Sequence, residues 1–371
     1  MINRYNGLIA ILIQQRHQQN TLYPTKYNNH YRLTSINMTK QDSSTTIIDI
    51  AKRANVTDIT VSRAFNHPEL VKKETREKIL AIAQELNYVP NVFARNLKNK
   101  NSRIIGVVTD STFNPFYVVL IQTVSRLAKE KGYQVMIFDT DSDEKAEQTA
   151  IETLVSYKAS GILLSPVRDD KAYQPSYLSL IDQHKVPLVF VDRSIYGKDY
   201  PGLFLKNFEI GALTGKYLNQ QRSENTLIVS GPEHSEISLS RLAGIYDQFT
   251  NRKNIHVLYS SYIFSKRDEE YLREKIKELY TPNMYIVGLN GIITAGMYKI
   301  ISELGLSCRY FSVDLPPYAD TYHLSISGVH HDSVYLGKRT AELLFAEIEG
   351  GSTKETGSKQ IFVNGKLVTY D

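Results

Sequence analysis

Two hydrophobic patterns divide the chain. Between residues 46 and 86, apolar residues recur at spacings of three and four, which is the period of an amphipathic helix. From residue 104 onward, short apolar runs alternate with longer amphipathic segments, which predicts β-α units with parallel strands and helices on both faces of a sheet. The predicted strands are 104–108, 134–138, 161–165, 187–191, 227–230, 256–259, 284–288 and 311–313. So long an alternation is too much for one sheet.

The amino-terminal helical unit begins at a capping box. Thr46 is followed three residues later by Asp49, so each side chain can bond a free backbone amide of the first turn. The apolar stripe of the first helix is Ile47, Ile50, Ala51 and Ala54. This helix ends near Asn55, and Thr57 can cap a second helix that runs to about Asn66. Two capped helices across a short turn predict a helix-turn-helix.

A third helix is predicted from about Glu74 to Leu86. Its predicted core residues are Ile79, Leu80, Ala83 and Leu86. Lys72 precedes this helix and has no side-chain oxygen to cap its free backbone amides, so the start of this helix is less well satisfied. The following segment 90–98 begins with proline and is too short to be a stable helix alone, so we expect it to fold only on DNA.

Three stretches resemble the lactose and purine repressor family of transcriptional regulators: IDIAKRANVTDITVSRAFN, ETREKILAIAQELNYVPNVFARNLKNK and IIGVVTDSTFNPF. The likeness runs from about Thr46 to the carboxyl terminus. It implies an α/β protein with a small all-α helix-turn-helix headpiece and a two-lobed core of doubly wound parallel sheets, similar to periplasmic binding proteins, with about three chain crossings between the lobes. The expected domains are a disordered or non-native extension (1–45), the DNA-binding domain (46–89), a hinge helix and linker (90–102), and the effector-binding and dimerisation domain (103–371).

The second helix of a helix-turn-helix lies in the major groove, so its exposed residues are candidates for DNA contact. Arg63 can pair bidentately with guanine, and short polar side chains suit phosphates or base edges. The resemblance implies that Asp58 and Ile59 distinguish operators and that Leu97 of the hinge wedges between base steps in the minor groove. Without operator, the hinge would be a linker with Leu97 packed on the core. The candidates are Thr57, Asp58, Ile59, Thr60, Arg63, Asn66, Asn91, Ala94, Leu97 and Lys98.

Ligands of open α/β sheets bind beyond the carboxyl ends of strands. The candidate effector-binding residues follow predicted strands: Asp110, Phe113, Asn114, Phe116, Asp192, Arg193, Lys206, Asn207, Arg241, Asn290, Asp314 and His331. The resemblance assigns effector contact to the arginine of Arg241-Leu242-Ala243-Gly244. Asp192 and Asp314 are equally compatible with helix capping.

The resemblance also bears on the effector. Lys206 and Gly291 stand where many family members that bind neutral sugars or purines carry aspartate. With Arg193 and Arg241 nearby, this favours an anionic effector, because arginine forks match phosphate oxygens, and a sugar phosphate fits best. The segment 254–262, with Asp192-Arg193, is also similar to the fructose- and sucrose-responsive branch of the family.

Charge is unevenly placed. Residues 1–38 carry a net +4 and residues 39–103 a net +5, so residues 104–371 carry −4 within the overall +5. A positive amino-terminal part suits phosphate contact. Residues 1–45 are rich in Asn, Gln, Tyr and His, and Met38 lies close to where the family's chains begin, so natural translation of residues 1–37 is left open. A single cysteine excludes a disulfide framework, and no apolar run approaches a membrane span, so we expect a cytoplasmic protein.

These features together predict a repressor of carbohydrate-utilisation genes. We expect a homodimer, with a tetramer left open, that binds a pseudo-palindromic double-stranded DNA operator and a small sugar-like effector, with no cofactor, metal or membrane. The alternative is a sugar-binding protein without DNA function, which would have no use for residues 46–97. No Walker loop, HExxH or G-x-S-x-G motif supports an enzyme, and His330-His331 is a lone pair. Operator sequence, effector identity, and induction or co-repression are left open.

Overall fold

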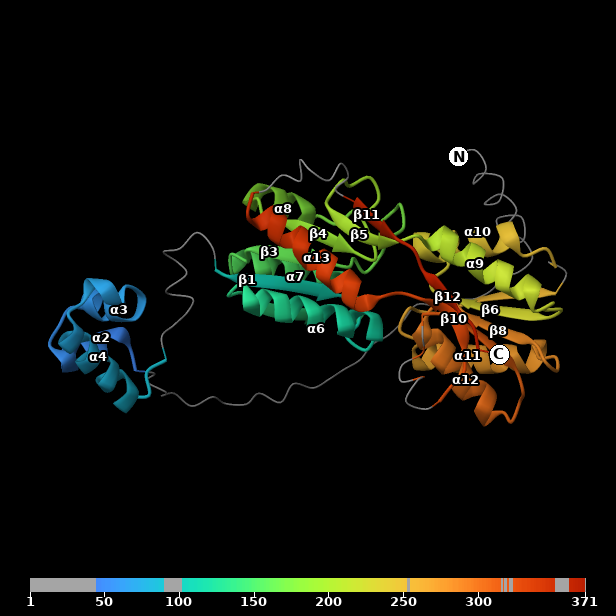
Figure 1. The fold of residues 1–371 in the computed structure, drawn as a ribbon, viewed down its shortest axis with the longest axis horizontal. Helices are drawn as coiled ribbons and strands as arrows, with labels where there is room; N and C mark the ends of the chain where they lie inside the picture. The colour runs from blue at the N-terminus through green and yellow to red at the C-terminus, as the bar shows by residue number, and fades with distance from the viewer. Residues whose placement is uncertain are drawn as a thin grey trace. The chain divides into compact units, whose positions relative to one another are not determined.

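The structure, a computed structural model, describes residues 45–89, 102–251, 254–314, 316, 319, 323–350 and 360–370. The chain forms two compact units, and the described residues 45–89 and 102–370 fall in different units (Figure 1). We call them the headpiece and the core. The predicted amino-terminal extension before residue 45 and most of the predicted hinge, including Asn91, Ala94, Leu97 and Lys98, lie outside the described residues.

The headpiece is a helix-turn-helix followed by a packing helix. Its elements are α2 (Ile47–Ala54), α3 (Asp58–Asn66), a 3-10 turn (Pro68–Leu70) and α4 (Lys73–Glu85). The capping box of Thr46 and Asp49 is formed in both directions, and Asn55 ends α2 in the left-handed conformation at φ 57°. Thr57 caps α3, whereas Lys72 makes no capping bond at α4, as predicted.

Burial of a few large apolar residues holds the three helices together. Ile50, Val61 and Ile79 are fully buried. One core prediction was wrong: Leu80 is 40% exposed, and Ile82 is buried in its place. The reason is helical phase, because Ile79, Ile82 and Ala83 share one face of α4 at three-and-four spacing, and Leu80 projects from its edge.

The first lobe of the core is a six-stranded parallel sheet of order β11-β5-β4-β3-β1-β2. Its strands are β1 (Ile104–Thr109), β2 (Gln134–Asp139), β3 (Gly161–Leu164), β4 (Leu188–Val191), β5 (Gly202–Leu205) and β11 (Gln360–Val363). Helices α6 (Pro115–Glu130) and α13 (Ser333–Ile348) pack together over one face, and α7 (Glu144–Ser156) and α8 (Tyr177–His184) cover the other. Neighbouring strand residues Leu163 and Leu164 therefore enter opposite core clusters, as the pleat requires.

The second lobe repeats this plan with the order β12-β10-β9-β8-β6-β7. Its strands are β6 (Thr226–Ser230), β7 (Ile255–Tyr259), β8 (Tyr285–Gly288), β9 (Arg309–Val313), β10 (Ser327–His330) and the antiparallel edge strand β12 (Lys366–Val368). Helices α9 (Asn207–Gln220) and α10 (Glu236–Gln248) cover one face, and α11 (Lys266–Leu279) and α12 (Gly291–Glu303) the other. Strands β5, β10, β11 and β12 were not among the predicted strands.

The chain passes between the lobes three times, as predicted. The connections are Lys206 between β5 and α9, 331–332 between β10 and α13, and 364–365 between β11 and β12. In Figure 1 the last of these is visible as the β11 strand of one lobe leading directly into β12 of the other. Among the residues that the structure describes, no helix is both long and apolar enough to cross a bilayer.

Candidate nucleic-acid interface and interlobe site

The exposed face of α3 carries the predicted base-reading residues. Asp58, Ile59, Arg63 and Asn66 are exposed, Ile59 by 57% although it is apolar. Thr57 and Thr60 are committed to the helix start, because the Thr57 hydroxyl accepts the Thr60 amide at 3.2 Å and lies 2.9 Å from the Thr60 hydroxyl. The Arg63 carbonyl accepts the His67 amide, but the Arg63 guanidinium makes no hydrogen bond or ion pair with another described residue. Its five donors are therefore available to a ligand on this face.

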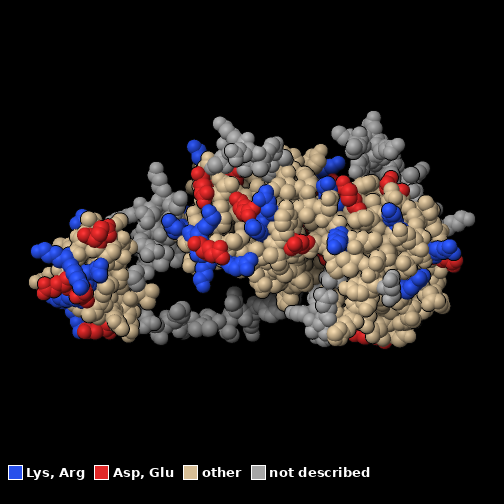
Figure 2. All heavy atoms as spheres, in the orientation of Figure 1, with Lys and Arg blue, Asp and Glu red and all other residues tan. Residues whose placement is uncertain are grey.

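The positive charge near the headpiece is concentrated on the hinge. Residues 46–89 hold seven basic and six acidic residues, whereas residues 90–103 hold four basic residues and no acid. Figure 2 accordingly shows Lys and Arg side chains on the visible face of the headpiece with acidic side chains beside them. Non-specific attraction to phosphates should therefore depend more on the hinge than on the three helices.

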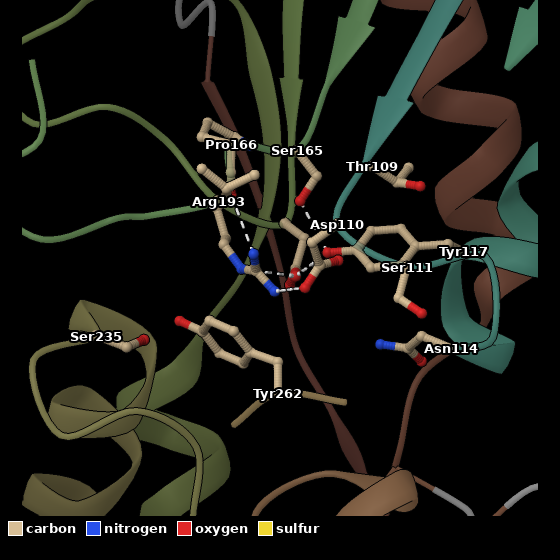
Figure 3. Close-up of polar contacts among 12 residues, drawn as sticks. Thr109, Asp110, Ser111, Asn114, Tyr117, Ser165, Pro166, Arg193, Ser235 and Tyr262 are labelled. Atoms are coloured by element: carbon tan, nitrogen blue, oxygen red, sulfur yellow. Dashed lines mark hydrogen bonds and ion pairs between the residues drawn. The ribbon is translucent and has the colours of Figure 1, made fainter. Parts of the chain in front are cut away.

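In the first lobe, polar side chains meet where β1 and β3 end. The neighbours of β1 in the sheet, β2 and β3, lie on opposite sides of it, so the chain reverses direction across the sheet here. Such a switch point is the usual ligand site of a doubly wound sheet. Asp110 follows β1, Ser165 follows β3, and Asp192 and Arg193 follow β4. Hydrogen bonds bring these residues together with Tyr117 from α6. Figure 3 shows Asp110, Tyr117, Ser165 and Arg193 in this cluster.

The buried ion pair of Arg193 and Asp110 is the centre of this cluster. Arg193 is 3% exposed and Asp110 1%, and a guanidinium nitrogen donates to Asp110 Oδ2 at 2.7 Å. A second nitrogen donates to the Pro166 carbonyl at 3.0 Å. The Tyr262 ring of the second lobe covers the guanidinium at 3.8 Å, as Figure 3 shows. Within this ion pair, Arg193 Nε and Asp110 Oδ1 have no hydrogen-bond partner among the described residues.

A second carboxylate, Asp192, lies beside this pair. The Tyr117 hydroxyl donates to Asp192 Oδ2 at 2.8 Å and lies 2.7 Å from the Ser165 hydroxyl. Arg193 Nε is 4.0 Å from the same Asp192 oxygen, too far for a hydrogen bond. Burial raises the pKa of Asp192, although the charges of Arg193 and Arg241 oppose the shift.

Asp192 and Asp314 occupy matching places in the two lobes. Each directly follows a strand, β4 or β9, and each has a left-handed backbone, with φ 66° and 63°. This conformation is uncommon outside glycine but tolerated by Asp and concentrated at functional sites. Neither residue is the N-cap of a described helix, so capping does not explain them. Asp314 Oδ1 instead lies 2.9 Å from His331 Nε2.

Burial alone would raise the pKa of Asp314, but His331 and then Arg241 outweigh it, so the pKa is lowered. The carboxyl of Asp314 is therefore ionised at neutral pH. Arg241 influences Asp192 of the first lobe as well as Asp314 of the second. The charge of Arg241 thus acts to lower the pKa of one aspartate in each lobe.

Arg241 reaches this position because α9 and α10 cross closely. A Cβ on Gly244 would lie 2.0 Å from the Phe208 carbonyl oxygen, and one on Gly211 would lie 2.0 Å from the Arg241 carbonyl oxygen, so both positions need glycine. The close approach lets Arg241 Nε donate to Asn207 Oδ1 at 2.8 Å, while Nη1 donates to the Leu289 carbonyl. The close packing of α9 against α10 thus explains why Gly244 follows Arg241 by three residues.

Other predicted effector residues lie apart or have structural tasks. Phe113 is 87% exposed, and Phe116 is half-buried with its ring edge-to-face against Tyr117. Asn114 and Asn290 cap α6 and α12 through their side-chain oxygens. The predicted carboxylates Asp110, Asp192 and Asp314 all follow strands, and Asp110 neutralises Arg193, so Arg193 is not a free positive charge of the site.

Three residues were missed by the sequence prediction. Tyr117 joins Ser165 to Asp192, Tyr262 covers Arg193, and Asp169 connects the two lobes. Tyr262 lies in the segment that resembles the fructose- and sucrose-responsive branch, which was a usable signal. No local pattern marks Tyr117 or Asp169. Among the described residues, no group of three or more His, Cys, Asp or Glu side chains is placed to hold a metal ion.

The helix-turn-helix and the polar interlobe cluster define a class of protein, a DNA-binding regulator joined to a ligand-binding core. Comparison with known proteins agrees. Residues 46–91 match the model for bacterial regulatory proteins of the lacI family, and residues 105–322 match the periplasmic binding protein domain. The chain belongs to the lacI family of bacterial regulatory proteins, and it is a transcription regulator.

Three relatives illustrate the match. The HTH-type transcriptional repressor PurR of Klebsiella pneumoniae is 24% identical over 335 residues, which cover 87% of this chain and 95% of that protein. The sucrose operon repressor of Pediococcus pentosaceus is 30% identical over 50% of this chain and 55% of its own length. The lac repressor dimer bound to operator and the anti-inducer ONPF has a TM-score of 0.69 at 22% identity, over 88% of this chain and 98% of that one.

Proposed function

We propose that this regulator represses carbohydrate-utilisation genes and is controlled by a small sugar-like effector bound between its lobes. The observation that carries the proposal is the pair of unsatisfied buried atoms, Asp110 Oδ1 and Arg193 Nε, at the switch point of the first sheet. One atom accepts and the other donates. A sugar hydroxyl does both, so neighbouring hydroxyls would satisfy them together.

The effector that we propose is phosphorylated. The charge of Arg193 is matched by Asp110, so the attraction for an anion rests on Lys206 and Arg241 in the second lobe. Lys206 is half-buried at the start of α9, where backbone amides and the helix dipole also favour an anion. The hydroxyls would then lie toward the first lobe and the phosphate toward the second.

We further propose that the chain acts as a cytoplasmic homodimer on a pseudo-palindromic operator. The free donors of Arg63 on α3 support base reading, and the lac repressor structure is a dimer bound to operator. The relatives are regulators rather than enzymes, which favours a purely regulatory role. A sugar-binding protein without DNA function is disfavoured, because it would not need the exposed face of α3.

Calorimetric titration of the full chain tests the effector. The ligands are fructose 1-phosphate, fructose 6-phosphate, sucrose 6-phosphate and their unphosphorylated parents. We expect one phosphate to bind at least about a hundredfold more tightly than its parent, as two charge-assisted hydrogen bonds imply. Lys206→Asp should remove this preference. Lys216→Asp, at an exposed position of the same helix, should keep it. If a free sugar binds as tightly as its phosphate, and Lys206→Asp changes neither, the anionic part of the proposal is wrong.

A further inference from the structure

The segment 165–176, which links β3 to α8, joins three parts of the molecule. Its beginning belongs to the interlobe site, because Ser165 contacts Tyr117 and the Pro166 carbonyl accepts from Arg193. Its middle contacts the second lobe, and its end leads into Tyr177 of α8. We call this segment the arm.

The middle of the arm is attached to the second lobe through one carboxylate. Asp169 is 6% exposed, and its Oδ2 accepts from the Ser235 hydroxyl at 3.0 Å and from the Ile237 amide at 3.0 Å. Its Oδ1 accepts from the Tyr262 hydroxyl at 3.3 Å. All three donors belong to the second lobe. Two of them, Ser235 and Ile237, form the start of α10, where a negative charge is favoured. Asp169 therefore fastens the lobes together.

Both ends of the arm are held by a different carboxylate, that of Glu147 on α7. Glu147 is fully buried, and its Oε2 accepts the Val167 amide at 2.6 Å. Its Oε1 accepts the hydroxyls of Tyr173 at 2.6 Å and Tyr177 at 2.5 Å. One of these attachments lies two residues before Asp169 and the others lie four and eight residues after it. A single side chain thus closes the loop whose middle carries Asp169.

The three hydrogen bonds that Glu147 accepts from described residues all stay within the first lobe, so this side chain does not itself contact the second lobe. Its burial without a basic partner within hydrogen-bonding distance needs a reason, because an ionised carboxylate is costly to bury. Three donors from the arm and α8 offset that cost only while the arm keeps this shape. Glu147 and the shape of the arm therefore depend on each other.

We propose that Glu147 is a positioning residue for closure of the lobes: it fixes the arm so that Asp169 meets the start of α10 and Tyr262. Closure would cover Arg193 with Tyr262 and so complete the interlobe site. This inference depends on the proposed function only for the consequence that closure has for an effector. The geometry of closure can be tested without one.

Distances between spin labels measure closure directly. Labels on Lys198→Cys in the first lobe and Glu270→Cys in the second are both at exposed positions, and the labelled full chain is diluted with unlabelled protein. The native Cys308 is half-buried, and burial raises its pKa to about 11, so it should react slowly at neutral pH. No effector or DNA is added.

We expect one dominant interlobe distance in the labelled parent. Asp169→Ala should lower the ratio of closed to open molecules by about tenfold or more, because each bond to a charged acceptor is a strong one. Glu147→Gln should shift the distances in the same direction, and combined with Asp169→Ala it should add nothing further. Glu152→Gln, at an exposed position of α7, and Asp199→Ala, at an exposed position of the first lobe, are the controls and should match the parent.

Two results would overturn the inference. The first is a parent-like distance distribution in Asp169→Ala. The second is a parent-like distribution in folded Glu147→Gln. If Glu147→Gln fails to fold, Tyr177→Phe removes one bond and keeps the carboxylate, and a parent-like distribution in that variant counts against the proposal equally. A failure to find a sugar phosphate by calorimetry would leave these distances unaffected, so the two proposals fail separately.

Discussion

Removing Asp110 should destabilise the core more than removing its partner Arg193. Asp110→Ala leaves a guanidinium that is 3% exposed without its 2.7 Å partner, and arginine cannot lose its proton. Arg193→Met leaves a buried carboxyl that can take up a proton and become neutral. Asp110→Ala should therefore lower the free energy of unfolding more than Arg193→Met does.

The magnitude follows from the surroundings of the pair. Breaking a buried ion pair by removing one partner costs about 3–5 kcal/mol. For Asp110→Ala the cost should fall near the lower end, because Asp192 remains 4.0 Å from Arg193 Nε and compensates part of the charge. At about 2–4 °C per kcal/mol for a unit of this size, the melting temperature should fall by roughly 6–12 °C. The double variant Asp110→Ala/Arg193→Met should recover much of the loss, since no uncompensated charge remains.

Thermal and urea unfolding of the parent, both single variants and the double variant give the complete cycle. If the two single variants are equally unstable, or if the double variant loses the sum of both, the ion pair is not the main interaction of these side chains.

Three further predictions concern DNA and pH. Arg63→Ala should cost roughly 1–3 kcal/mol of operator-binding free energy per half-site, measured against binding to random duplex. Lys98→Ala should weaken binding to all duplexes alike and lower the slope of log affinity against log salt concentration by about one per subunit. Equal losses on both duplexes for Arg63→Ala would reject base reading. Leu97→Ala should reduce operator bending, measured by fluorescence transfer between duplex ends, without unfolding the core; unchanged bending would mean that the leucine is no wedge. Burial raises the pKa of Glu147 despite the hydrogen bonds from Tyr173 and Tyr177. The parent should therefore lose stability relative to Glu147→Gln as pH rises above about 4.5. A difference in unfolding free energy between the two proteins that stays constant from pH 4 to 7 would contradict this.

The sequence predicted those elements whose formation is local. The capping box at Thr46, the Thr57 cap and the missing cap at Lys72 depend on residues within one helical turn, and all three are present. Short apolar runs also identified eight of the strands, β1 to β4 and β6 to β9. Short edge strands such as β12 were not predicted, because they exist only through pairing with a strand that is distant in sequence. Leu80 was misplaced although the three-and-four spacing of Ile79, Ile82 and Ala83 puts Ile82 on the buried face and Leu80 at its edge.

The interlobe site was predicted less completely, for a physical reason. Strand-end position identified Asp110 and Arg193 singly, but they are 83 residues apart, and nothing local shows that one neutralises the other. The prediction of an anionic site counted Arg193 as a free charge for that reason. Asp169 and Glu147 were not predicted either, because their roles depend on hydrogen-bond donors that other elements supply.

The three connections between the lobes are only one or two residues long, and they run close together. A Cβ on Gly365 would lie 2.3 Å from Val329 and 3.1 Å from His331, and 3.2 Å from Ile210 just beyond Lys206. Three short, neighbouring tethers permit the lobes to swing about one common axis but not to slide apart. Two residues of these tethers, Lys206 and His331, are also candidate effector contacts. The residues that would contact the effector are then also part of the hinge between the lobes. A substitution at either position that changes ligand preference should therefore also change the angle between the lobes in the absence of ligand.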